Sequence, residues 1–178
     1  MEVRPDNGAD RRGLLRFDLS DIPSNATITS AELYLYELDN KPDQVTYVYR
    51  VTTAWTETGV TWATPWMQPG GDFYNETAYA LFIPNQKNCM VSLDVSGLVQ
   101  NWVSGRHPNY GLMLYSTGSN HIIKYTTKED TKNPERAPRL EITYTIDAAS
   151  QPSFLETLRN FFNTLFSFFG GRQARAGL

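Results

Sequence analysis

The side chains able to carry out catalysis do not form a recognisable catalytic set in this sequence. Cys89 is the only cysteine, and it begins an apolar run, where an inert buried thiol is the usual outcome. The sequence contains no Gly-x-Ser-x-Gly segment that would present a nucleophilic serine. Many pairs of acidic residues can be drawn, but their spacing singles out none of them. We therefore predict that the chain is not an enzyme.

Metal binding has equally little support. His107 and His121 have neither a cysteine partner nor the short His–His spacing of zinc sites. A structural calcium ion would use carboxylate oxygens, and the candidates that carry them are Asp18, Asp21, Asp94, Glu129 and Asp130. The sequence does not show which of these converge, and Asp94 is explained more simply as a helix cap. No cofactor is expected.

Aromatic residues in loops are the best candidates for contact with a ligand. Trp66, Tyr74 and Tyr79 lie in or beside a stretch rich in glycine and proline, where rings are less committed to packing. Packing of the loop itself is the alternative role for the same three residues. Trp55 and Trp62 flank a glycine turn, and we expect them to close one end of the body rather than to form a platform for a sugar.

These candidates must be positioned by a body built mostly from short strands. Alternation of apolar and polar residues, or a short apolar run, recurs in segments separated by turn residues. The expected strands are 15–19, 28–38, 45–51, 79–83, 90–93, 111–116, 122–127 and 139–146. This pattern predicts an all-β fold, namely a two-sheet jelly-roll sandwich.

One short helix interrupts the strands. Val95, Leu98, Val99 and Trp102 recur at helical spacing and predict a single buried face. Asp94 or Ser96 would cap the start of this helix, and Gly105 suits its left-handed end.

Composition limits the class of protein. The 178 residues suffice for one domain with an appendage. The net charge of −3 gives no electrostatic argument for binding nucleic acid. A single cysteine rules out a disulfide within the chain, and no apolar run of the length that spans a membrane is present. No signal peptide follows Met1, so we expect either a cytoplasmic protein or a processed piece of a longer one.

The composition changes near the C-terminus. We assign residues 1–147 to the sandwich, 148–152 to a linker, and 153–178 to an amphipathic helix followed by a disordered tail. The helix would begin with a capping box, Ser153 with Glu156, and end at Gly170. Its apolar stripe would fold back on the sandwich, pack against another copy, or lie on lipid; we favour protein contacts because Arg159 is the only basic residue on its polar side. The predicted self-association residues are Phe154, Leu158, Phe161, Phe162, Leu165, Phe166 and Phe169.

Six segments in order resemble the signatures of DNRLRE-type domains. They are residues 14–23 (LLRFDLSDIP), 28–35 (ITSAELYL), 55–62 with its two tryptophans, 94–102, 109–112 (NYGL) and 138–144 (PRLEITY). The resemblance implies a jelly-roll sandwich from secreted and surface proteins. Some members of that family are carbohydrate-binding modules attached to polysaccharide-degrading enzymes or to disaggregatase-like proteins, and others have no assigned ligand.

The chain departs from this family at both ends. Members usually have one more strand before the segment that matches residues 3–12, and here that strand is absent. The aromatic helix after Tyr144 is also foreign to the pattern. The loss of an outer strand leaves backbone groups unpaired and part of the core open, so the tail or a strand from another molecule should fill the gap.

Two functions follow as hypotheses. The first is a non-catalytic module that binds a polysaccharide or glycoconjugate outside the cell or at its surface. The second is a self-assembling subunit of an extracellular filament or surface layer, a homo-oligomer joined through the open sheet edge and the C-terminal helix. A polysaccharide-active enzyme is a weaker third. Two sequons, at Asn25 and Asn75, are candidate glycosylation sites.

Overall fold

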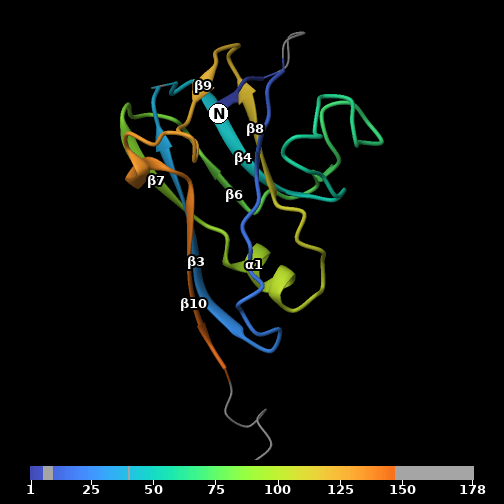
Figure 1. Ribbon diagram of the computed structural model, residues 1–178. Coiled ribbons are helices and arrows are strands. Elements are labelled where there is room, and N and C mark those ends of the chain that lie inside the picture. The colour runs from blue at the N-terminus through green and yellow to red at the C-terminus, as the bar shows by residue number, and fades with distance from the viewer. Residues whose placement is uncertain (6–9, 40, 147–178) are drawn as a thin grey trace, which may run out of the picture. The chain divides into compact units, whose positions relative to one another are not determined.

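Two antiparallel sheets carry most of the fold in the computed structural model, which describes residues 1–5, 10–39 and 41–146 (Figure 1). In strand order, the smaller sheet contains β10 (Arg139–Thr145), β3 (Thr27–Glu37) and β7 (Cys89–Asp94). The larger contains β2 (Gly13–Leu15), β8 (Leu112–Gly118), β4 (Gln44–Val51) and β5 (Phe73–Tyr74), with β6 (Ala80–Phe82) also paired to β4. A short third sheet joins β1 (Glu2–Val3) to β9 (Ile123–Lys124).

The predicted all-β class is therefore confirmed, with differences in detail. The described strands form three sheets rather than two, because β1 and β9 make a separate two-stranded ladder. The jelly-roll connectivity stays a prediction. The predicted linker 148–152, the helix 153–169 and the tail lie outside the described residues. Among the residues that are described, no helix is long and apolar enough to span a membrane.

The main core lies between the two large sheets. On β3, Ala31, Leu33 and Leu35 are fully buried, whereas Tyr34 and Tyr36 on the other face are half-buried. This strand pairs with β10 on one side and with β7 on the other, as its two apolar faces predict. Its buried residues meet those of the opposite sheet, chiefly Val48, Leu112 and Leu114.

Helix α1 (Ser96–Val103) packs on this core through the face that the spacing predicts. Its buried residues include Leu98, Val99 and Trp102, and Gly105 follows its end with a positive φ of 71°. The N-cap residue is Val95 rather than Asp94 or Ser96, and no side chain caps from that position. The Asp94 carboxylate instead accepts the Ser96 backbone N–H at 2.8 Å from one residue further back.

Several strand boundaries differ from those expected. The strand predicted at 15–19 is β2, which ends at Leu15, and Phe17 lies beyond its ladder. The reason is the partner strand, because Gly111 turns with a φ of 83° just before β8 begins. A Cβ at Gly111 would lie 2.3 Å from the Leu15 carbonyl oxygen, so only glycine permits this close approach. Neither the two-residue strand β5 nor the 3₁₀ helix η1 (Pro134–Arg136) was predicted.

Candidate functional site

The outer face of the large sheet carries a cluster of aromatic side chains. Along β4, Gln44, Thr46 and Val48 are buried between the sheets, so Tyr47 and Tyr49 project from the opposite face. Tyr115 of β8 and Phe73 of β5 share this face through the strand register. We call these four residues, Tyr47, Tyr49, Phe73 and Tyr115, the aromatic face.

The rings of the aromatic face contact one another. The ring centroids of Tyr47 and Tyr49 lie 5.9 Å apart in a stacked arrangement. Tyr49 lies 5.2 Å from Phe73 and 6.1 Å from Tyr115, and Phe73 lies 5.8 Å from Tyr115. These contacts hold the rings in fixed positions, and all four residues keep part of their surface in solvent.

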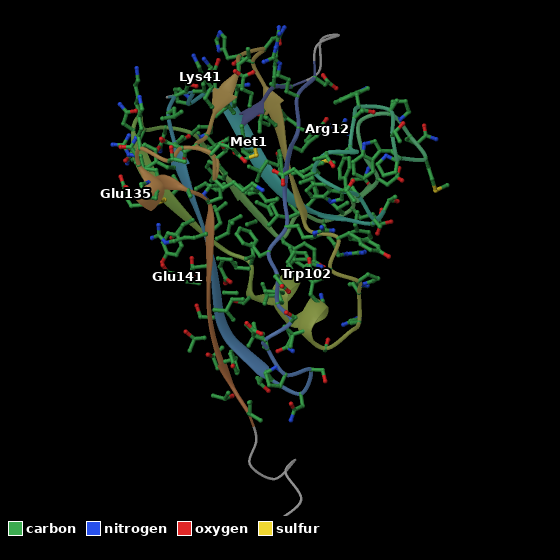
Figure 2. The ribbon with its side chains drawn as sticks, in the orientation of Figure 1. Met1, Arg12, Lys41, Trp102, Glu135 and Glu141 are labelled. Carbon is green, nitrogen blue, oxygen red and sulfur yellow. The ribbon has the colours of Figure 1, made fainter. Side chains whose placement is uncertain are left out.

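Arg12 borders the aromatic face. Its guanidinium carbon lies 5.0 Å from the Tyr115 ring, 5.2 Å from Phe73 and 5.1 Å from Trp62. The same guanidinium donates to the Gly70 carbonyl oxygen at 2.7 Å. Figure 2 shows Arg12 next to the long segment between β4 and β5, which it joins to the sheet.

The segment between β4 and β5 has its own small core. Trp66 is only 9% exposed, packs with Val51 and Met113, and donates from Nε1 to the Thr61 carbonyl oxygen at 2.9 Å. The Asp72 carboxylate accepts two backbone N–H groups, those of residues 67 and 68, and a threonine hydroxyl. Burial alone would raise the Asp72 pKa, but these donors outweigh burial and lower it. Because Trp66 is buried and its Nε1 is hydrogen-bonded within this segment, it has the surroundings of a packing residue, which is the alternative role considered for it.

The structure places the other two predicted ligand residues on a different surface. Tyr74 is directly opposite Arg50, whose guanidinium carbon lies 5.6 Å from the Tyr74 ring. This register puts Tyr74 on the opposite side of the sheet from the aromatic face. Tyr79 is half-buried against the main core, and its hydroxyl lies 3.4 Å from the Asn101 amide nitrogen. The structure thus does not bring Trp66 together with the two tyrosines.

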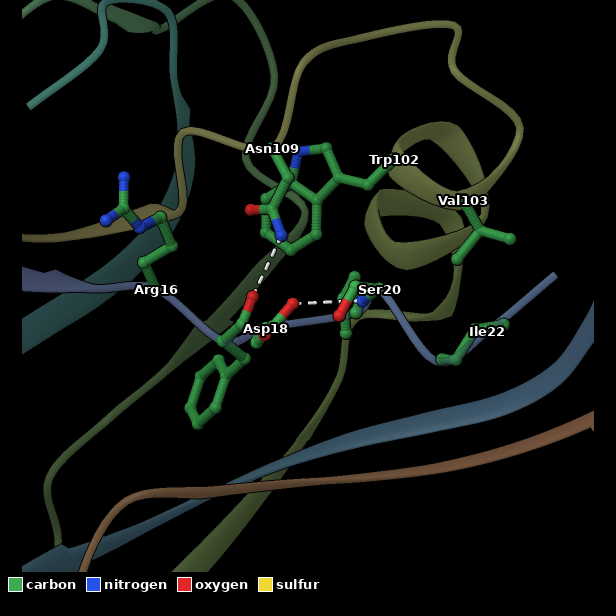
Figure 3. A pocket seen from close by; sticks show the side chains of 9 residues that line it. Arg16, Asp18, Ser20, Ile22, Trp102, Val103 and Asn109 are labelled. Carbon is green, nitrogen blue, oxygen red and sulfur yellow. Dashed lines mark hydrogen bonds between the residues drawn. The ribbon is translucent and has the colours of Figure 1, made fainter. Parts of the chain in front are cut away.

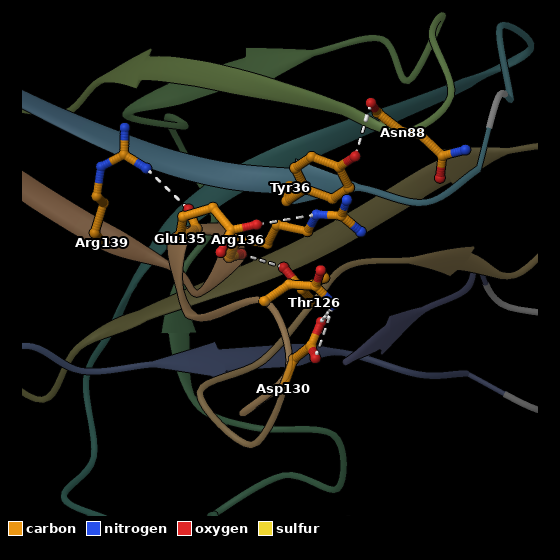
Figure 4. Close-up of polar contacts among 8 residues, drawn as sticks. Tyr36, Asn88, Thr126, Asp130, Glu135, Arg136 and Arg139 are labelled. Atoms are coloured by element: carbon orange, nitrogen blue, oxygen red, sulfur yellow. Dashed lines mark hydrogen bonds and ion pairs between the residues drawn. The ribbon is translucent and has the colours of Figure 1, made fainter.

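The outer face of the small sheet also bears tyrosines, but arginines cover them. The guanidinium carbon of Arg139 lies 4.2 Å from the Tyr34 ring. That of Arg136 lies 4.6 Å from the Tyr36 ring, and the Tyr36 hydroxyl donates to the Asn88 carbonyl oxygen (Figure 4). These rings are engaged within the protein, whereas Tyr47 has no such cover among the described residues.

Two clefts lie along residues 12–22. One, of about 680 Å³, is lined by residues 16–20, Ile22, Trp102, Val103 and Asn109 (Figure 3). Asn109 donates to the Phe17 carbonyl oxygen at 2.9 Å across its wall. The second, also about 680 Å³, is lined by residues 12–17 and by residues 127–129. Both clefts follow the segment that continues β2, whose ladder pairs it with β8 alone.

The cysteine and two of the acidic residues considered for chemistry form hydrogen bonds within the protein. No three His, Cys, Asp or Glu side chains in them group around a common point, and Asp18 and Asp94 accept bonds from neighbouring serines instead. Cys89 donates weakly to Glu37 Oε2 at 3.8 Å, and burial together with Glu37 raises the pKa of its thiol. A thiol so placed is a poor nucleophile.

Comparison with known families identifies this kind of protein. A family model described as carbohydrate-binding module family 96 matches residues 1–144, which is most of the chain. The chain belongs to carbohydrate-binding module family 96. No curated protein shows a match to it. The wider expectation of a carbohydrate-binding module family is thereby confirmed, and the DNRLRE resemblance stays a prediction.

Sequence reasoning missed the aromatic face of this family 96 module. The alternation of β4 was visible, but it does not say which side of the strand faces the core. The available signal was that Gln44 and Thr46 make one side polar, while the other side carries two tyrosines and two valines. An aromatic side that is turned outward inverts the usual expectation that the larger apolar side is buried.

Proposed function

We propose that this family 96 module is non-catalytic and binds a polysaccharide or glycoconjugate through its aromatic face, outside the cell or at its surface. The observation that carries the proposal is the outward projection of Tyr47 and Tyr49 from a central strand, in a family that binds carbohydrate. On the small sheet, by contrast, Arg136 and Arg139 cover Tyr36 and Tyr34, so these two rings pack within the protein.

The chemistry of the aromatic face suits a sugar. A pyranose ring has apolar C–H faces and a polar rim of hydroxyls, so it matches an aromatic ring with hydrogen-bonding groups nearby. Tyrosine supplies both, because its ring is apolar and its hydroxyl donates and accepts. Rings already packed against each other lose little conformational entropy when a ligand binds.

The test is retention of the full chain on a panel of polysaccharides that includes β-glucans, xylan, mannan, chitin, α-glucans and polyuronates. We expect Tyr47→Ala to weaken binding to the retained polysaccharide by roughly tenfold, or about 1.4 kcal/mol. Tyr34→Ala is the matched control, because it removes a tyrosine from the outer face of the other sheet, and it should change affinity less than twofold. Equal losses in both variants, or no retention on any member of the panel, would contradict the proposal.

The earlier ligand candidates are tested in the same assay. Tyr74 is 38% exposed at the edge of the sheet, and its hydroxyl donates to Glu76 at 2.7 Å. If Tyr74→Ala abolishes retention and Tyr47→Ala does not, the sugar binds at this edge instead of at the aromatic face. The sequons at Asn25 and Asn75 are both exposed, and their glycosylation stays a prediction.

A second function is supported by the free sheet edges. Among the described strands, β10 pairs only with β3, and β2 pairs only with β8. Unpaired edges beside the two clefts are sites where a strand from another copy can add. Assembly into a filament or surface layer remains the alternative, and light scattering with negative-stain microscopy of the purified chain tests it. Rods or large oligomers would support assembly, and a monomer would contradict it.

A further inference from the structure

Resting on the proposed function, we infer that the aromatic face binds an internal stretch of an extended polysaccharide chain, which crosses the strands of the large sheet from β6 towards β2. The family match gives the class of ligand but neither the site nor the direction of the bound chain. Both come from the strand register and from the exposed position of Leu81 at the border of the sheet.

The register aligns one row of side chains across the sheet. Leu81 of β6 is directly opposite Tyr47 of β4, and Tyr47 is directly opposite Tyr115 of β8. On the next strand, Gly13 of β2 is opposite Leu114, which aligns the preceding residue, Arg12, with Tyr115. The guanidinium carbon of Arg12 lies 5.0 Å from the Tyr115 ring, so the row continues without a gap.

The row is long enough for more than one sugar ring. Adjacent strands lie about 4.8 Å apart, so four positions in line span on the order of 14 Å. Leu81, at one end, is 58% exposed on an edge strand of the sheet. An exposed leucine in line with two outward tyrosines extends the apolar floor to the border of the sheet, where a bound chain continues into solvent.

The sides of the row differ. On the Tyr49 side, the row is bordered by the segment between β4 and β5. Trp62 of this segment is 44% exposed, and its ring lies 5.1 Å from the Arg12 guanidinium carbon. Leu81, Tyr47 and Tyr115 line neither of the two clefts described above, whereas Arg12, at the β2 end of the row, lines the second of them. The row is therefore a track along the surface with one raised side. Recognition of a chain end would require a closed pocket around that end.

A binding surface of this kind predicts how affinity depends on two properties of the ligand. Affinity should rise with chain length until the ligand covers the row, and it should not depend on the chemistry of the chain ends. It also makes Leu81 a contact for long ligands only, because Leu81 lies at the border. A chain that ran along β4 instead would pass over Tyr47 and Tyr49 without reaching Leu81.

The experiment is titration calorimetry of the full chain with defined oligosaccharides, increasing in length, of the polysaccharide that the panel retains. We expect affinity to increase at least tenfold from the shortest ligand that binds to the plateau, and reduction of the reducing end to leave it within twofold. Leu81→Ser should weaken binding of the longest oligosaccharide at least threefold and leave the shortest unchanged. Met67→Ser is the control, because Met67 is 87% exposed and outside the row.

Four outcomes would overturn the inference. Affinity that is already maximal for a single sugar unit, or that is lost when the chain end is reduced, means that the site recognises ends. Loss of affinity that is equal in Leu81→Ser and Met67→Ser, or absent from both, means that the chain does not cross β6. These results leave the proposed function intact, whereas failure of retention by the whole panel contradicts the function itself. Thermal melting of each variant separates a folding defect from a binding defect.

Discussion

The same residue type has two different roles on the outer faces of this protein. Tyr34 and Tyr36 lie beneath arginines at 4.2 and 4.6 Å, so their rings belong to the protein's own packing. Tyr47 and Tyr49 stack on each other at 5.9 Å and remain partly exposed. Tyr34 and Tyr36 therefore differ from Tyr47 and Tyr49 in their surroundings, and residue type alone does not make this distinction.

Glu37 is a second residue whose role depends on its surroundings. It is fully buried on the inner side of β3, beside Cys89 of β7 and Tyr125 of the strand-like segment on its other side. Its Oε1 atom has no hydrogen-bond partner among the described residues. The pKa of Glu37 is raised from 4.5 to about 7, chiefly because of burial; the bond from Cys89 lowers the pKa and the nearby Asp39 charge raises it.

We predict that Glu37 makes the folded state less stable as the pH rises. The folded protein holds the extra proton between pH 4.5 and about 7, so the free energy of unfolding falls through this window and is constant above it. Allowing for solvent screening near the strand end, the loss is roughly 1–3 kcal/mol. Denaturant unfolding at pH 5 and pH 8 measures it.

Glu37→Gln should remove this pH dependence and leave the protein more stable than the parent at pH 8. Glu32→Gln is the control, because Glu32 is on the same strand and faces outward. If the parent and Glu37→Gln lose stability in parallel between the two pH values, Glu37 does not carry the effect.

At the scale of elements, hydrogen bonds fix the start of helix α1, and a glycine ends it. Asp94 accepts from the Ser96 N–H and hydroxyl at 2.8 and 2.6 Å, and the Ser96 hydroxyl oxygen accepts the Ala31 N–H at 2.8 Å. The start of the helix is therefore bonded to the middle of β3. At the other end, the positive φ of Gly105 ends the helix before the turn into β8.

Replacement by alanine should have opposite effects on the stability of the protein at two glycines, Gly97 within this helix and Gly105 after its end. Gly97 lies in the helix with no heavy atom within 4 Å of an added Cβ, so Gly97→Ala should stabilise the protein by roughly 0.5–1 kcal/mol through helix propensity. Gly105 has equally open space but a φ of 71°, so Gly105→Ala should destabilise by roughly 1 kcal/mol. Urea unfolding of both variants tests this pair. Effects of the same sign would mean that space rather than backbone conformation governs these positions.

At the scale of the whole molecule, the sequence carries an aromatic stripe in residues 153–169. The stripe predicts protein contacts, because its polar side has a single basic residue, Arg159. We predict that the full chain self-associates and that Phe162→Asp, which places a charge in the stripe, shifts it to monomer.

Light scattering of the two proteins measures this shift, and Thr164→Asp, on the polar side of the same stripe, is the control. The thermal unfolding of the sandwich should be the same in all three proteins, since the substitutions lie outside Met1–Thr145, which forms one compact unit. Equal oligomeric states in parent and variants would exclude the stripe as the cause of association.

Local rules account for much of what the sequence predicted correctly. The spacing of Leu98, Val99 and Trp102 predicted helix α1, and the pattern of residues 28–38 predicted strand β3. Both features depend on neighbours in the chain or on a single strand. The limits of β2 were predicted wrongly, because they depend on Gly111, which is about a hundred residues away.

Which side of β4 faces outward depends on long-range contacts in the same way. Alternation along β4 divides its side chains into two sets, but only the opposing sheet selects which set is buried. Here Val48 and Thr46 face the core, and Tyr47 joins Leu81 and Tyr115 in a row contributed by three strands. The local sequence therefore carries the strands and the helix, and the long-range pairing of strands creates the surface on which a sugar would bind.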